Sequence, residues 1–254
     1  MGKKIRLIAR LDVKAPNLVK GIQMEGLRKL GDPNAFAKRY YEDGIDEILY
    51  MDIVASLYGR SSLFEIVKQT TRDVFIPITA GGGLRSVEDV RFMLQSGADK
   101  VAINTAAIKD KAIITQVAKA FGSQCLVLSI EAKRRQDAGG WEAYHDNGRQ
   151  HSSLDAVAWA KEGEKLGAGE ILLTSVDCEG LAKGMDINLI RAVSQAVSIP
   201  VIASGGLSGA EEAVAAARAG ASAVAAANLL HYRKCTVREL KQGIVKAGGK
   251  VRVC

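Results

Sequence analysis

Two acidic residues, each near the end of an apolar run, are the strongest candidates for catalysis. Asp12 closes the run IRLIARLD, and Glu131 closes the run QCLVLSIE. We expect both runs to be strands, and polar residues at the carboxyl ends of parallel strands commonly carry chemistry. Two carboxyl groups on opposite sides of a small molecule suit general acid and general base catalysis. The alternative is that each carboxylate pairs with the lysine two positions later, Lys14 or Lys133.

A repeated glycine motif predicts two anion sites. PITAGGGLRS begins at Pro77, and PVIASGGLSG begins 123 residues later, at Pro200. The pairs GIDEIL and GAGEIL, and Gly97-Ala98 and Gly220-Ala221, keep the same offset, which indicates a duplicated half-domain. Glycines after a strand let backbone N–H groups approach an anion, although they also serve as plain turn residues. We predict one phosphate site at Gly82, Gly83, Asn104 and Thr105, and a second at Gly205, Gly206 and Asn228.

Further polar residues at the predicted strand ends could contact a substrate. Arg10 lies two positions before Asp12, so both side chains leave the strand on the same side. An unpaired buried cation is costly, so Arg10 either forms an ion pair with Asp12 or Glu131 or binds a substrate carboxylate. Substrate contacts are also predicted for a second group of strand-end residues, in which the acids could instead be solvated or cap loops: Asp52, Asp177, Glu179 and Ser204.

Short apolar runs that alternate with amphipathic stretches predict the elements that position these residues. The strands are predicted at 5–11, 47–51, 74–79, 100–103, 124–130, 170–175, 200–204 and 223–227, with helices at 34–43, 86–96, 154–166 and 210–219. This pattern predicts a (β/α)₈ (TIM) barrel with an internal half-barrel repeat, forming one domain over residues 1–254. An open doubly wound sheet would leave the two repeats inequivalent. We expect a long loop without regular structure at 15–33 and a β-hairpin flap at 135–153.

Composition argues against several classes of function. Aromatic residues make up 5% of the chain, and its net charge of +7 comes from no dense basic run, so nucleic-acid binding is not expected. A positive field instead favours a small anionic substrate. We expect no membrane span and no signal peptide. The four cysteines have no CxxC spacing and the three histidines no metal-ligand spacing, which predicts a reduced, cytoplasmic protein without metal or cofactor.

With these residues in hand, the chain resembles the cyclase subunit of imidazole glycerol phosphate synthase over essentially its whole length. LDVK, GGGLRSVED, GADKVAINTAA, GAGEILLTS and IPVIASGG carry the resemblance. It implies a barrel that receives ammonia from a glutaminase subunit docked on its N-terminal face and builds an imidazole ring on a bisphosphate substrate. It also implies acid/base roles for Asp12 and Glu131 and substrate contact by Lys20. The implied ammonia gate consists of Arg6, Glu47, Lys100 and Glu170, which could otherwise be a salt-bridge cluster that plugs the barrel.

The predicted site departs from the pattern of this family at several positions. Glu131 replaces aspartate, Arg10 replaces a small residue, Asn228 replaces serine, and DCEGL replaces DRDGT after the sixth strand. A changed site beside an unchanged gate resembles a paralogue group tied to acetamidino formation on surface-polysaccharide (O-antigen) sugars. We therefore hypothesise ammonia addition to a sugar N-acyl group, with Arg10 as the partner of an acidic sugar. The alternative is imidazole glycerol phosphate synthesis in histidine biosynthesis.

Two further hypotheses remain open at this point. The chain could be a non-catalytic scaffold that only activates a glutaminase. It could also be the related single-chain isomerase of histidine biosynthesis, which shares the duplicated barrel. The isomerase needs no ammonia gate, so the four gate residues count against it.

Overall fold

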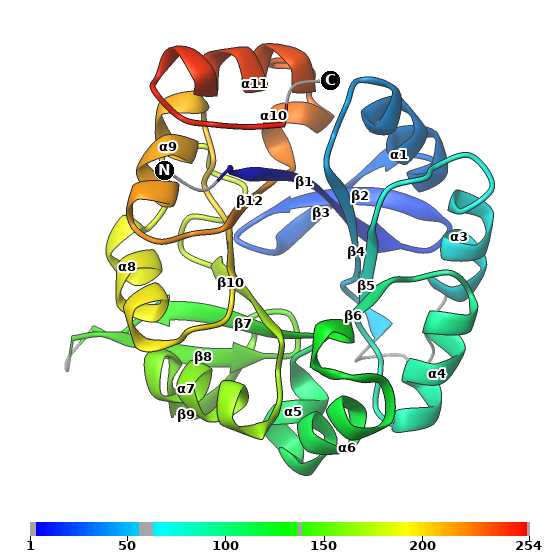
Figure 1. Ribbon diagram of the computed structural model, residues 1–254, viewed down its shortest axis with the longest axis vertical. Helices are drawn as coiled ribbons and strands as arrows, with labels where there is room; N and C mark the ends of the chain where they lie inside the picture. Colours follow the sequence, from blue (N-terminus) through cyan, green and yellow to red (C-terminus); the bar gives the residue numbers. More distant parts are fainter. Residues whose placement is uncertain (1–3, 56–62, 137–138, 253–254) are drawn as a thin grey trace.

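Eight parallel strands close into a barrel in the computed structural model, which describes residues 4–55, 63–136 and 139–252. β1 pairs with both β4 and β12, and β10 pairs with both β7 and β11, so the ring has no open edge. This confirms the predicted (β/α)₈ barrel (Figure 1). The barrel strands are β1 (Arg6–Lys14), β4 (Glu47–Asp52), β5 (Ile78–Gly81), β6 (Lys100–Ile103), β7 (Leu126–Arg134), β10 (Glu170–Ser175), β11 (Val201–Ser204) and β12 (Ala223–Ala226).

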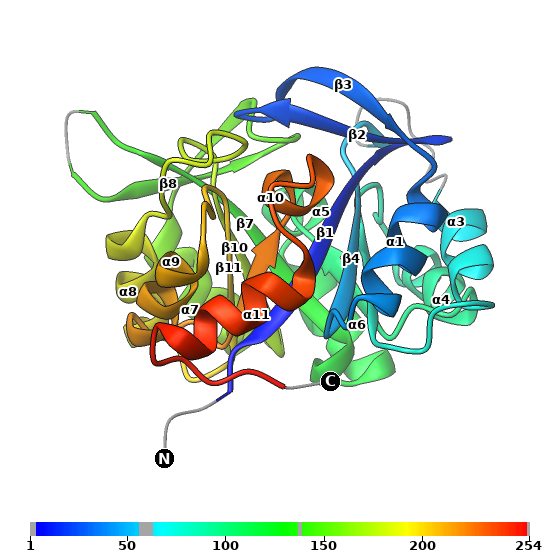
Figure 2. The same ribbon diagram turned by 90° about the horizontal axis from the view of Figure 1, so that it is seen from above.

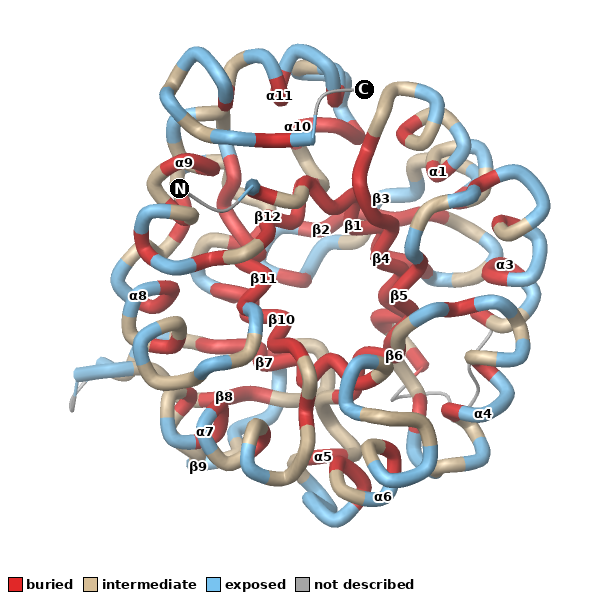
Figure 3. Tube along the Cα trace, viewed as in Figure 1, coloured by how far each residue is buried: buried red, intermediate tan, exposed pale blue. Residues whose placement is uncertain are grey.

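Helices surround the barrel and bury one face against it (Figures 1 and 3). In the helix that begins at Val237, the buried residues Val237, Leu240 and Ile244 recur at the spacing of one helix face. Every helix in the described part of the chain is too short or too polar to cross a bilayer. The helices are α1 (Pro33–Glu42), α3 (Leu63–Thr70), α4 (Val87–Gln95), α5 (Thr105–Lys109), α6 (Ala112–Phe121), α7 (Ala156–Leu166), α8 (Ile187–Ala196), α9 (Ala210–Arg218), α10 (Asn228–His231) and α11 (Val237–Lys246), with a 3₁₀ turn η1 (Ser123–Cys125).

The interior of the barrel is mainly apolar in the middle and charged at both ends. Alternate strand residues, among them Ile8, Leu49 and Leu172, pack together inside the ring. On β1 the same two-residue period takes the chain from Arg6 through Ile8 to Arg10 and Asp12. One strand therefore contributes a cation to each end of the barrel and a candidate catalytic acid to the carboxyl end.

A β-hairpin replaces the long loop that we predicted at 15–33. β2 (Asn17–Ile22) and β3 (Glu25–Gly31) form an antiparallel pair that extends from β1 across the carboxyl end of the barrel (Figure 2). The prediction was wrong because the turn of this hairpin carries no usual turn residue. Gln23 and Met24 make the turn with φ of 50° and 67°, which is uncommon for residues other than glycine, asparagine and aspartate.

The predicted hairpin flap at 135–153 is present. β8 (Trp141–His145) pairs with the end of β7 and with β9 (Gln150–Asp155); positions 137 and 138 of the flap lie outside the described residues. This pairing carries β7 to Arg134, four residues past the predicted end. β5 begins at Ile78 rather than at residue 74, because the N–H of Val74 still bonds to Thr70, the last residue of α3.

We expect Gly169 to tolerate no side chain, because it touches the η1 turn. A Cβ at this position would lie 2.1 Å from the carbonyl oxygen of Ser123, which is backbone and cannot rotate away. Gly169→Ala should therefore lower the free energy of unfolding by about 2 kcal/mol, measured by urea denaturation. The control is Gly209→Ala, where a Cβ has no heavy atom within 4 Å and where we expect a change below about 1 kcal/mol, the loss of a glycine N-cap of α9. Equal effects of the two changes would contradict this account.

Candidate active site

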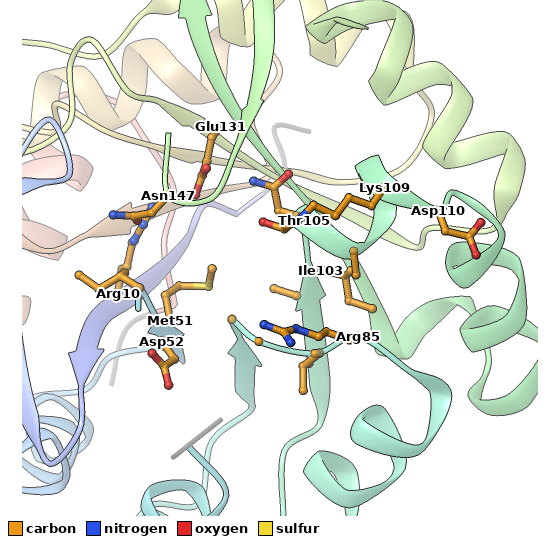
Figure 4. Close-up of a pocket in the computed structure, with 17 residues that line it drawn as sticks. Arg10, Met51, Asp52, Arg85, Ile103, Thr105, Lys109, Asp110, Glu131 and Asn147 are labelled. Atoms are coloured by element: carbon orange, nitrogen blue, oxygen red, sulfur yellow. The ribbon is translucent and has the colours of Figure 1, made fainter. Parts of the chain in front are cut away.

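A cavity of about 410 Å³ opens at the carboxyl ends of β4, β5, β6 and β7. The barrel strands contribute Arg10, Asp52 and Glu131 to its walls. The loop after β5 contributes Gly82 and Gly83, the start of α5 contributes Thr105, and the β8–β9 turn of the flap contributes Asn147. Figure 4 shows Arg10, Glu131 and Asn147 on one side of this cavity and Thr105 and Lys109 on the other. The cavity thus brings together one candidate acid and one predicted phosphate site.

Asp12 is buried and ion-paired with two cations. Its carboxylate accepts a bond of 2.9 Å from Arg10 Nε and one of 3.0 Å from Lys20 Nζ. Burial alone would raise the pKa of Asp12, but Arg10 and Lys20 outweigh it and hold the pKa below its usual range. Asp12 therefore pairs with Arg10 and Lys20 and not, as the alternative had it, with Lys14. Asp12 is not among the described residues that line the cavity. Asp12 is an ionised group behind Arg10 and Lys20.

Arg10 reaches across the mouth of the barrel from β1. Besides Asp12, its guanidinium donates bonds of 3.0 Å to the hydroxyls of Thr174 on β10 and Ser204 on β11. Burial opposes the charge of Arg10, but the attraction of Asp12 and Glu179 raises its pKa above the usual value. Of the two options left open by the sequence, the structure contains the ion pair with Asp12, and Arg10 also lines the cavity.

Glu131 lies on β7 in a different environment. The residue is 5% exposed, and its carboxyl group accepts a bond of 2.7 Å from the N–H of Gly148 in the flap. Burial raises the pKa of Glu131 to about 7, because the bond from Gly148 and the charge of Arg10 compensate only in part. Lys133 lies over the ring of Tyr144 instead of pairing with Glu131. A carboxyl group with this pKa can both accept and donate a proton at neutral pH.

Lys20 connects the β2–β3 hairpin to the site. Its ammonium is buried, contacts Asp12, and also forms an ion pair with Glu179 from the loop after β10. The backbone N–H of Gln23 bonds to the carbonyl of Glu179, and Asn147 of the flap donates to the carbonyl of Met24. The hairpin therefore lies against both the β10 loop and the flap, and it covers Asp12.

The two predicted phosphate sites differ. The first cradle, Gly82, Gly83, Asn104 and Thr105, borders the cavity of about 410 Å³, together with Arg85 and Lys109. The second cradle, Gly205, Gly206 and Asn228, borders a space of about 20 Å³ that Glu179 and Gly180 also line. Asn104 donates to the carbonyl of Tyr144, and Asn228 donates to the carbonyl of Gly180.

The four predicted gate residues form a closed ring at the opposite end of the barrel. Arg6 contacts both Glu47 and Glu170, and Lys100 Nζ lies 3.3 Å from Glu47 and 2.7 Å from Glu170. Each cation is shared between the two carboxylates, so the ring is neutral. An open hollow of about 500 Å³ lies outside it, lined in part by Lys4, Arg6, Lys100 and Glu170.

Of the remaining residues predicted to contact substrate, one lines the cavity and one does not. Asp52 is buried, lines the cavity and caps the N–H of Val54, whereas Asp177 is exposed and accepts from the N–H of Arg134. Sequence reasoning missed Thr174, Gly148 and Lys109. The Asp-Asn-Gly sequence at 146–148 indicates the turn between β8 and β9, but nothing in the sequence indicates that Gly148 donates to Glu131. The described residues contain no group of three or more histidine, cysteine or acidic side chains that could hold a metal ion.

Comparison with known proteins identifies relatives over most of the chain. Residues 6–236 match the family described as "Histidine biosynthesis protein". A Legionella pneumophila protein is 62% identical over 208 residues, covering 82% of this chain and 98% of its own length. Proteins of Corynebacterium glutamicum (strain R) and Thermococcus onnurineus are 48% and 47% identical, covering 99% and 98% of this chain and 100% and 98% of their own lengths. All three are named "Imidazole glycerol phosphate synthase subunit HisF".

The raised pKa of Glu131 makes a prediction about stability. The folded protein keeps the Glu131 proton up to about pH 7, whereas the unfolded chain loses it near pH 4.5. Because the folded state then binds more protons between these values, the contribution of Glu131 to the free energy of unfolding falls as the pH rises through this window. We expect Glu131→Gln, which cannot ionise, to gain about 2–3 kcal/mol relative to the parent between about pH 5 and pH 8.

Urea denaturation of both proteins over this pH range measures the difference. Glu142→Gln is the control and should show no such gain: burial raises the pKa of this flap carboxyl, but its bonds from Ser153 and His151 together outweigh burial and lower the pKa. If the free energies of unfolding of the parent and Glu131→Gln changed in parallel with pH, Glu131 would be ionised in the folded protein over this whole pH range.

Proposed function

The chain belongs to the histidine biosynthesis protein family and, within it, to the HisF-like cyclase subunits, and we propose that it is the ammonia-using synthase subunit of a glutamine amidotransferase complex. One observation carries this proposal. The ring of two cations and two carboxylates, which has no net charge, and the buried carboxyl group of Glu131 lie at opposite ends of one barrel. Both ends are reached by β1, through Arg6 on one side and Arg10 and Asp12 on the other.

The barrel interior suits the passage of ammonia. Between the ring and the cavity most inward-facing residues are apolar, among them Ile8, Leu49 and Leu172, with the small hydroxyls of Thr79 and Ser129 at the same level. Neutral ammonia can cross such a region, whereas an ammonium ion would lose its hydration without gaining a partner. In this proposal ammonia enters past Arg6, Glu47, Lys100 and Glu170 from a glutaminase subunit docked on the N-terminal face. It meets the acceptor in the cavity beside Glu131.

Asp12 and Glu131 divide the acid/base work according to their environments. Asp12 stays ionised between Arg10 and Lys20 and, from behind them, holds the charge and position of the two cations. Glu131, with a pKa of about 7, accepts a proton from the attacking nitrogen and returns it to the leaving group. Two carboxyl groups held at different pKa values are the usual basis for such a division of roles.

Two acceptors are candidates. The names of the relatives favour the bisphosphate precursor of imidazole glycerol phosphate and hence a role in histidine biosynthesis. A specific observation favours an N-acyl sugar of surface polysaccharides, converted to an amidine. Arg10 and Glu131, both departures from the family pattern, lie together at the wall of the cavity, where a guanidinium could contact a sugar carboxylate. Either acceptor would be bound as an anion near the first cradle.

Turnover with ammonium salt at alkaline pH tests the acceptor directly. Imidazole formation at full rate from the bisphosphate precursor excludes the sugar reaction. Amidine formation on an N-acyl sugar without imidazole formation excludes the histidine pathway. If neither acceptor consumes ammonia, with or without a glutaminase, the proposed function is wrong.

We expect the two acids to be required for the chemical step. Asp12→Asn and Glu131→Gln should each lower kcat at least about a hundredfold with whichever acceptor supports turnover, because each removes a charge or a proton-transfer group. The matched control is Glu88→Gln, an exposed carboxylate paired with Arg91 on α4. Retention of parental kcat by both variants would support the scaffold hypothesis instead.

The gate predicts a difference between the two nitrogen sources. Lys100→Met leaves Glu47 and Glu170 with one shared cation, Arg6, so the ring gains a negative charge that retains ammonium. Glutamine-dependent turnover with the glutaminase partner should fall about tenfold, the effect of one charge-assisted hydrogen bond. Turnover with free ammonia, which reaches the cavity from its open side, should fall far less.

The control for this experiment is Lys111→Met, which removes an exposed ion pair with Glu162 on the outer helices. It should change neither rate. An equal loss of both rates in Lys100→Met would show that the ring acts on the stability of the barrel and not on the supply of nitrogen.

A further inference from the structure

The turn between β8 and β9 holds two residues of the first cradle through its backbone. The carbonyl of Tyr144 accepts a bond of 3.1 Å from the side-chain amide of Asn104. The N–H of Asp146 donates a bond of 3.1 Å to the hydroxyl of Thr105. A hydroxyl has one proton and two lone pairs, so a Thr105 that accepts from Asp146 keeps its own proton for a ligand in the cradle. The turn therefore fixes the direction in which Thr105 donates.

The same turn also holds Glu131. The N–H of Gly148, two residues after Asp146, donates a bond of 2.7 Å to the carboxyl group of Glu131. Thr105 begins α5 and Glu131 lies on β7, and Figure 4 shows their side chains on different sides of the cavity. One short segment of backbone thus connects the first cradle with the candidate acid.

The conformation of this turn makes it act as one unit. Asp146, Asn147 and Gly148 have φ of 50°, 60° and 72°, and the N–H of Arg149 bonds to the carbonyl of His145 at 3.1 Å. Three successive residues in the left-handed region are rare, because this region is costly for most residues and is entered most readily by glycine, asparagine and aspartate. A backbone confined in this way has few alternatives, so the N–H groups of Asp146 and Gly148 move together.

Contacts with the β2–β3 hairpin and the β10 loop hold the turn in place. The side-chain amide of Asn147 donates a bond of 3.3 Å to the carbonyl of Met24 in the hairpin. A Cβ on Gly148 would lie 3.2 Å from Sδ of Met24 and 3.3 Å from Cγ1 of Val176, so the space beside this glycine is already filled. The turn therefore has little room to move, and its neighbours set the direction of the N–H that bonds to Glu131.

We propose that Thr105 and the turn of residues 146–148 are positioning residues for Glu131, so that the first cradle and the proton on Glu131 are coupled through the backbone of the flap. A ligand that accepts the proton of Thr105 polarises the hydroxyl and strengthens its bond from Asp146. Because the turn moves as a unit, this bond also sets the bond from Gly148 to Glu131. The acid role of Glu131 rests on the proposed function, whereas the coupling does not.

The groups around Glu131 give the sign of the effect. Burial raises the pKa of Glu131, and the bond from Gly148 is the strongest influence that lowers it, ahead of the charge of Arg10. Asp12 on β1 and Asp146 on the turn raise it further. The other charged side chains that line the cavity with Glu131 are Asp52, Arg85, Lys109 and Asp110. Loosening the bond from Gly148 should therefore raise the pKa of Glu131.

Carbon-13 NMR of glutamate-labelled protein measures the titration of Glu131, with the spectrum of Glu131→Gln to assign its resonance. Thr105→Val removes the acceptor for Asp146 and should raise the pKa of Glu131 by about half a unit or more, because the bond from Gly148 loosens. Thr105→Ser keeps the hydroxyl and should leave this titration unchanged.

A second pair of variants changes the turn itself. Asn147→Val places a β-branched residue at φ of 60° and should raise the pKa of Glu131 by about one unit, whereas Asn147→Gly permits this conformation and should shift the pKa far less. Arg233→Val is the control, because it imposes the same backbone strain at an exposed residue with φ of 54° outside the site. It should not shift the titration of Glu131.

An unchanged titration in either site variant with valine, or an equal shift in a valine variant and its matched serine or glycine variant, would overturn the proposal. So would a fall of the pKa toward its ordinary value, which would mean that the turn acts by excluding water. If Thr105→Val does not fold, the pair at Asn147 decides. Shifted titrations in a protein whose Glu131→Gln variant keeps full turnover would refute the acid role and leave this inference standing. Lost turnover in Glu131→Gln with unshifted titrations would do the reverse.

Discussion

The arrangement of the barrel mouth depends on the burial of Asp12 between two cations. A buried carboxylate requires partners, and Arg10 and Lys20 supply them from β1 and from the β2–β3 hairpin. Each partner makes further contacts: Arg10 to β10 and β11, and Lys20 to Glu179. Charge balance around one aspartate therefore sets the position of the hairpin, of the β10 loop and of the wall that bounds the cavity.

The two ends of the barrel use the duplicated fold in different ways. At the amino end, the ring contains one carboxylate from each half, Glu47 and Glu170, and each cation contacts both. At the carboxyl end the halves have diverged, with an ionised Asp12 on one side and a Glu131 of raised pKa on the other. Symmetry is kept where a small neutral molecule would pass and lost where a larger acceptor would bind.

Much of the fold could be predicted from the sequence, because charged residues at the starts of β6 and β10 precede apolar runs, and the predicted bounds 100–103 and 170–175 match the structure. The β2–β3 hairpin was missed because its turn, at Gln23 and Met24, has unusual residues. The partners of Arg10 could not be predicted, since Thr174 and Ser204 are 164 and 194 residues away. The unequal space beside the two cradles was hidden for a similar reason, because the repeat makes both glycine motifs look alike.

The pairing of β1 with β12 has a consequence for synthesis of the protein on the ribosome. β1 emerges long before β12, but one of its edges bonds to Ala223–Ala226, and Ile5 bridges to Val251. Until the last strand has emerged, Arg6 and Arg10 can lie in no closed interior, and the partners of Arg10 on β10 and β11 are not yet in place. A nascent chain that stalls before β12 would expose the apolar residues of the barrel interior and an unpaired strand edge, which is the form that chaperones and proteases recognise.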